Sequence, residues 1–105
     1  MNNELENNYK VLKEIQNNPN TSQRKLAKEV GFSLGKLNYC LKALQQKGLI
    51  KIDNFKKNPN KISYAYILTP KGIKKKAKLT MNFMIRKMKE YDELKKELIK
   101  EKKIY

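Results

Sequence analysis

Apolar residues recur every three or four positions in three stretches of the first half of the chain, a spacing that predicts amphipathic helices. The segment 17–20 is rich in asparagine and proline and favours a turn after the first helix. A serine stands at the N-cap position of each of the next two helices, and a glycine follows each of them. These residues are Ser22, Ser33, Gly31 and Gly48.

The second and third helices are separated by only a few residues, which is the layout of a helix-turn-helix. In the third helix Leu37, Leu41 and Leu44 recur at i, i+4 and i+7 and should face the core. The opposite side of this helix is polar, and in a helix-turn-helix that side enters the major groove of DNA.

Alternating apolar residues follow and predict two strands at 49–55 and 62–68, joined by the basic loop KKNPNK. A hairpin placed after a recognition helix is a wing. Thr69 and Pro70 then suit the N-cap and first position of a helix. After Gly72 no helix breaker occurs through Tyr105, so about 30 residues should form a rod of roughly 45 Å.

This last helix carries more apolar residues than a small domain can cover. Ala77, Met84, Tyr91 and Leu98 are spaced by sevens, and the pattern lapses at Lys95. Such a heptad pattern is typical of helices that pair with one another. We assign to dimerisation the following residues, which we call the apolar seam: Ala77, Met81, Met84, Met88, Tyr91, Leu94 and Leu98. Phe83 and Ile85 lie off this seam and should contact another surface.

The predicted fold class is therefore mainly α with a β-hairpin wing. Residues 1–69 should form a winged helix-turn-helix DNA-binding domain, and residues 70–105 one long C-terminal dimerisation helix.

Charge supports a nucleic-acid partner. The chain has 25 Lys and Arg residues against 10 Asp and Glu, a formal net charge of +15. A coding bias toward lysine and asparagine is the alternative, but it would tend to raise glutamate as well. The positive charge is densest from the helix-turn-helix through Lys78.

Other features exclude several classes of function. The chain has no histidine and one cysteine, and it shows no metal-ligand cluster or glycine-rich phosphate loop. We therefore expect neither an enzyme nor a cofactor or metal. No apolar run is long enough to cross a bilayer, and the polar start is unlike a signal peptide, so we expect a cytoplasmic protein with no membrane partner.

Fourteen residues are candidates for DNA contact. Asparagine can pair with adenine, lysine with guanine or phosphate, and a basic wing can reach the adjacent minor groove. The alternative is a solvated helix face and loop, with simple capping by the serines. The candidates are Ser22, Gln23, Arg24, Ser33, Gly35, Lys36, Asn38, Tyr39, Lys42, Lys56, Lys57, Asn58, Asn60 and Lys61.

Five lysines open the last helix and form what we call the basic strip, either a second phosphate-facing surface or a solubilising one. They are Lys71, Lys74, Lys75, Lys76 and Lys78. Cys40, among the core leucines, is expected to be a small core residue, with a redox switch as the alternative.

Longer segments are similar to a known family. The run SLGKLNYCLKALQQKGLI, followed by a basic hairpin and AYILTPKGI, resembles winged-helix repressors of the MarR family. The segments GKLNYCLKAL, KISYAYILTPKGIKKKAKLT and RKMKEYDELKKE resemble the small branch associated with exopolysaccharide (EPS) biosynthesis genes. This chain departs from larger members by its short N-terminal part and its single long C-terminal helix, which argues against a ligand pocket.

The resemblance implies a sequence-specific transcriptional regulator that binds double-stranded DNA. The apolar seam indicates that this regulator is a homodimer. It also implies control of exopolysaccharide biosynthesis genes, and it leaves any small-molecule effector unidentified. Two other functions stay open at this stage: a winged-helix module that binds another protein, and an RNA-binding protein without operator recognition.

Overall fold

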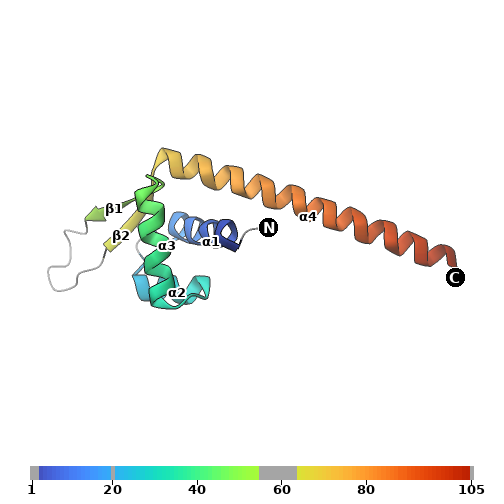
Figure 1. The fold of residues 1–105 in the computed structure, drawn as a ribbon, viewed down its shortest axis with the longest axis horizontal. Coiled ribbons are helices and arrows are strands. Elements are labelled where there is room, and N and C mark those ends of the chain that lie inside the picture. Colours follow the sequence, from blue (N-terminus) through green and yellow to red (C-terminus); the bar gives the residue numbers. More distant parts are fainter. Residues whose placement is uncertain (1–2, 20, 55–63, 105) are drawn as a thin grey trace.

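The computed structural model describes residues 3–19, 21–54 and 64–104. Three helices come first: α1 (Asn3–Asn17), α2 (Gln23–Val30) and α3 (Leu34–Gln46). The strands β1 (Ile50–Asn54) and β2 (Tyr64–Leu68) pair antiparallel, with Ile52 opposite Tyr66, and α4 (Pro70–Ile104) follows. Figure 1 shows this order, which confirms the predicted fold class of a winged helix-turn-helix followed by one long helix.

The predicted helix ends are confirmed. The hydroxyl of Ser22 accepts a hydrogen bond from the Lys25 amide at 3.2 Å, and that of Ser33 accepts one from the Lys36 amide at 3.1 Å. Gly31 ends α2 with a φ of 77°, a left-handed conformation that favours glycine. The turn between α2 and α3 is therefore set by residues within it.

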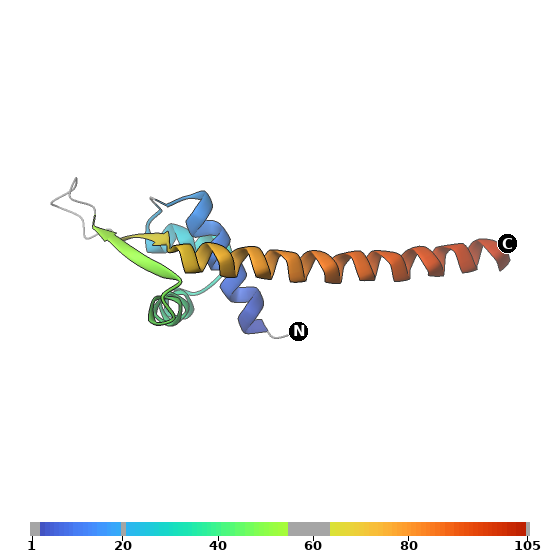
Figure 2. The same cartoon turned by 90° about the horizontal axis from the view of Figure 1, so that it is seen from above.

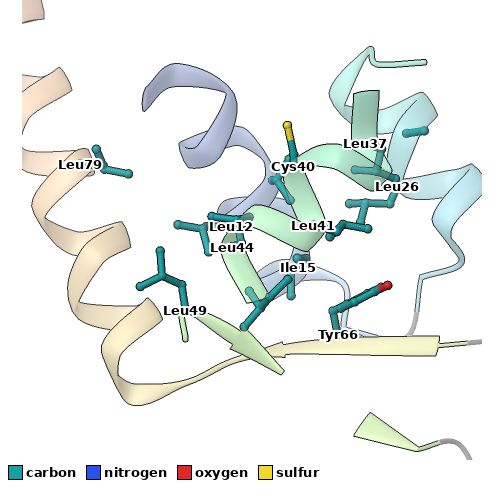
Figure 3. Packing of buried hydrophobic residues seen from close by; sticks show 13 residues of the cluster. Leu12, Ile15, Leu26, Leu37, Cys40, Leu41, Leu44, Leu49, Tyr66 and Leu79 are labelled. Carbon is teal, nitrogen blue, oxygen red and sulfur yellow. The ribbon is translucent and has the colours of Figure 1, made fainter. Parts of the chain in front are cut away.

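The core lies where α1, α2, α3 and the hairpin meet (Figure 3). Val11 and Leu12 of α1, Leu37 and Leu44 of α3, and Ile50 of β1 are the largest fully buried side chains. Tyr66 adds a buried ring from β2, so the wing is anchored to the helices at its base. The inward face predicted for α3 is confirmed, because Leu37, Leu41 and Leu44 are all buried.

Only the first turns of α4 pack on this core. Leu79 is buried and the ring of Phe83 lies 5.0 Å from that of Tyr9 on α1. Phe83 therefore contacts a surface other than the seam, as predicted from its position off the seam. Ile85, for which the same contact was expected, remains 55 % exposed. The burial of Leu79 was not predicted, since it belongs to neither the seam nor the residues expected beside it.

Beyond these turns α4 extends away from the rest of the molecule (Figures 1 and 2). Its 35 residues make a rod of about 52 Å, longer than the predicted 45 Å. The principal extents of the molecule are 68 × 25 × 21 Å, so most of its length is this single helix. The boundary at residue 70 coincides with the first residue of α4, and the division of the chain into two functional units there stays a prediction.

Candidate nucleic-acid interface

The outer side of α3 is uncovered. It lies opposite the buried leucines, and Tyr39 at its centre is 77 % exposed. Every candidate predicted on this helix and at its cap is exposed: Ser33, Gly35, Lys36, Asn38, Tyr39 and Lys42. The fold therefore presents amide, ammonium and phenol groups together on one free helix face.

Lys36 is held at the start of that face. Its ammonium lies 4.3 Å from the centre of the Phe32 ring, a distance at which a cation is attracted to an aromatic face. Phe32 packs in turn against the core. Lys36 and the free amides of the first turn of α3 together make this end of the helix attractive to an anion.

The start of α2 lies beside the wing. Gln23 donates a hydrogen bond from its amide nitrogen to the Tyr66 hydroxyl at 3.0 Å, which links α2 to β2. Arg24 is exposed, and Ser22 uses its hydroxyl to cap α2. The amide of Gln23 thus has a structural contact that the sequence did not reveal, and Arg24 is the side chain of this group that is free to reach a phosphate.

The tip of the wing lies outside the described residues. The predicted contacts Lys56, Lys57, Asn58, Asn60 and Lys61 all fall within this segment. The two strands that carry the tip are described, and Lys51 adds an exposed basic side chain on β1.

The basic strip occupies the first turns of α4. Lys71, Lys74 and Lys78 are exposed, and Lys75 is partly buried. Lys76 donates a hydrogen bond to the side-chain oxygen of Gln16 on α1, so this lysine also ties α4 to the domain.

The apolar seam is exposed along α4. Met81, Met84 and Met88 are between 53 and 58 % exposed, and Tyr91 and Leu94 are about two-thirds exposed. Leu98 is 54 % exposed, and Ala77 is exposed as well. The folded chain leaves this surface open to solvent over much of the rod.

Cys40 is buried on α3, as expected of a core residue. Burial raises the pKa of its thiol, an effect that nearby Lys36 opposes. Within the described ranges no three His, Cys, Asp or Glu side chains are grouped so that they could hold a metal ion. No helix in that part of the chain is both long and apolar enough to cross a membrane.

The chain is similar to known DNA-binding domains. Residues 4–51, which hold α1 to α3 and the start of β1, match the family of winged helix-turn-helix DNA-binding domains. No curated protein matches the chain.

Solved structures are similar to most of the chain. The PcaV transcriptional regulator from Streptomyces coelicolor is 19 % identical over 74 % of this chain and 56 % of its own, with a TM-score of 0.66. The transcriptional repressor CouR, solved on a 23-mer DNA duplex, is 24 % identical over 82 % of this chain and 59 % of its own, with a TM-score of 0.70. A MarR family transcription regulator is 18 % identical over 90 % of this chain and 68 % of its own, with a TM-score of 0.66.

The chain spans little more than half the length of PcaV and CouR. At these identities the similarity establishes the fold. The chain therefore contains a winged helix-turn-helix domain and has the fold of MarR-type transcription regulators.

Proposed function

We propose that this protein is a MarR-family transcriptional regulator that binds duplex DNA in a sequence-specific manner as a homodimer. The observation that carries the proposal is the exposed polar face of α3, centred on Tyr39. The opposite, apolar face of the same helix is buried in the core of the helix-turn-helix domain. A face of this kind on the second helix of the motif reads base edges in the major groove.

Charge supports the same function. The net charge of +15 on 105 residues gives a field that attracts the phosphate backbone, and binding should weaken as salt competes. Among the proteins with this fold, CouR has been solved on a DNA duplex. We assign base contacts to Asn38 and Lys36, and phosphate contacts to Arg24, Lys42 and the wing.

The seam of α4 supports the homodimer. An exposed row of methionine, tyrosine and leucine side chains costs free energy in water, and burial against an identical row removes that cost. A two-fold dimer would present two copies of α3 to the two halves of a palindromic site.

We further propose exopolysaccharide biosynthesis genes as targets. Support for this step is the resemblance of the segments around α3, β2 and α4 to the EPS-associated branch. Identification of the flanking genes, followed by genome-wide mapping of bound sites, tests it. Bound sites confined to unrelated promoters would reject the pathway and leave DNA binding unaffected.

A titration of fluorescent duplex DNA tests DNA binding by α3. Asn38→Ala should cost about 1–3 kcal/mol on the specific site and little on random duplex, because a base contact carries the discrimination. Lys36→Ala should lower affinity on the same site. Lys100→Ala is the matched control, since Lys100 is an exposed lysine near the far end of α4.

Equal losses for Lys36→Ala and Lys100→Ala would mean that charge alone is acting and that α3 does not contact the duplex. Absence of binding to any duplex at low salt would favour a protein-interaction module. Preferential competition by structured RNA would favour the RNA-binding alternative.

A further inference from the structure

The apolar seam faces away from the domain to which α4 belongs. Successive residues of an α-helix are rotated by about 100°, so Met81 and Met88 lie about 160° and 180° around the helix from Leu79. Leu79 is buried against the domain, whereas Met81 and Met88 are each 58 % exposed. The domain and the seam thus use opposite sides of the same helix, and a partner helix can reach the seam without displacing the domain.

Heptad positions can be assigned along this seam. Met81 and Met88 fall at a positions, and Ala77, Met84, Tyr91 and Leu98 fall at d positions. Three lysines also occupy a positions, namely Lys74, Lys95 and Lys102. In a parallel pair each a residue meets its own copy, so three layers of the seam would place lysine against lysine.

Charge is distributed unequally along α4. Residues 70–89 contain eight lysine and arginine residues and no acid, whereas residues 90–105 contain five basic and five acidic residues. Parallel pairing sets the two strongly basic halves side by side, which raises their electrostatic repulsion. Antiparallel pairing sets each basic half against a half that carries all the acids of the helix.

We propose that the seam binds the seam of a second copy of this chain in antiparallel orientation, an inference that rests on the homodimer of the proposed function. One antiparallel register places four consecutive apolar layers at the centre of the pair: Met81 packs against the partner's Tyr91, and Met84 against the partner's Met88. Lys95 then lies opposite the partner's Ala77, a small residue past which a lysine side chain can reach solvent.

The same register pairs charges at the flank of the seam. Lys78 and the partner's Asp92 fall at facing e positions, and the two-fold axis repeats this pair. Residues Pro70 of the two copies then lie about 48 Å apart along the rods, because 32 residues of rise separate them. The two winged helices occupy opposite ends of the paired helices.

Disulfide trapping in the full-length chain distinguishes the two orientations. M81C and Y91C are made separately in a Cys40→Ala background, one of them with an affinity tag, then mixed, exchanged and oxidised. A disulfide requires Cα atoms within about 4.4–6.8 Å. Antiparallel pairing predicts the mixed M81C–Y91C disulfide, since like positions lie about 15 Å apart. K89C, off the seam on the same helix, is the control and should give no disulfide.

A charge exchange tests the register without cysteines. K78E and D92K should each weaken the dimer, by about twofold to fivefold for each facing pair, and the double variant should restore it. Sedimentation equilibrium measures the dimer dissociation constants.

Disulfides between like positions would overturn the antiparallel orientation and leave both the dimer and DNA binding in place. Additive effects of K78E and D92K, with no restoration, would overturn the register. A monomeric mass at all concentrations would overturn self-pairing, and the duplex titration described above would still report on DNA binding independently.

Discussion

Gly72 is the glycine, among those described, at which an added side chain would meet neighbouring atoms. It is buried in the first turn of α4, beside the link between α3 and β1. A Cβ added there would lie 1.9 Å from the carbonyl oxygen of Leu49 and 2.9 Å from its carbonyl carbon. Gly72→Ala therefore forces two backbone segments apart at the point where α4 joins the DNA-binding domain.

The cost follows from the contacts that hold Leu49 in place. Ordinary contact begins near 3.4 Å, so the segments must separate by about 1.5 Å (3.4 minus 1.9). The Leu49 carbonyl accepts a hydrogen bond from the Thr69 amide at 3.0 Å, and the Thr69 hydroxyl donates to the Gly48 carbonyl at 2.6 Å. Both bonds would be strained.

Overpacking typically costs about 1–3 kcal/mol, and each lost hydrogen bond about 1 kcal/mol. The higher helix propensity of alanine offsets about 1 kcal/mol. We expect a net loss of about 2 kcal/mol or more, which lowers the melting temperature by roughly 8–16 °C in a chain of this size.

Thermal and urea unfolding followed by circular dichroism, at one fixed protein concentration, measure this loss. Gly35→Ala is the matched control, because Gly35 also lies in the first turn of a helix and no atom lies within 4 Å of an added Cβ. We expect Gly35→Ala to raise stability by up to about 1 kcal/mol. Equal melting temperatures for the two variants would refute the close approach of α4 to Leu49.

Three further predictions follow from burial, charge and length. Leu79→Ala should cost about 2–5 kcal/mol of unfolding free energy. Leu98→Ala, at an exposed position, should act only through the dimer, so its effect on stability should depend on protein concentration. Equal losses for the two variants that do not change with concentration would contradict this. Because burial raises the pKa of the Cys40 thiol, this thiol ionises at lower pH in the unfolded chain than in the folded one. The free energy of unfolding should therefore fall as pH rises above about 9 in the natural chain, and fall less in Cys40→Ala. The same pH dependence of urea unfolding in both chains would count against this. Removal of residues 91–105 should weaken dimerisation and operator affinity together, and a truncated chain that keeps both would exclude a role for the distal seam.

Local chemistry in the sequence was enough to predict the helix ends and the order of elements. Ser22, Ser33 and Thr69 cap helices with their own hydroxyls, and Gly31 accepts a left-handed turn, because each interaction spans only a few residues. The outer face of α3 was predictable for a related reason, since the spacing of its leucines determines which side of a helix is polar.

Tertiary structure decided which apolar face of α4 is covered. Leu79 and Met81 are both apolar residues of one helix, but Leu79 packs in the core and Met81 remains exposed. The heptad spacing separates Met81, on the seam, from Leu79, off it, but it does not show what lies opposite either residue. Gly72 and the bond from Gln23 to Tyr66 depend in the same way on segments more than 20 residues apart, and only the folded backbone brings such segments together.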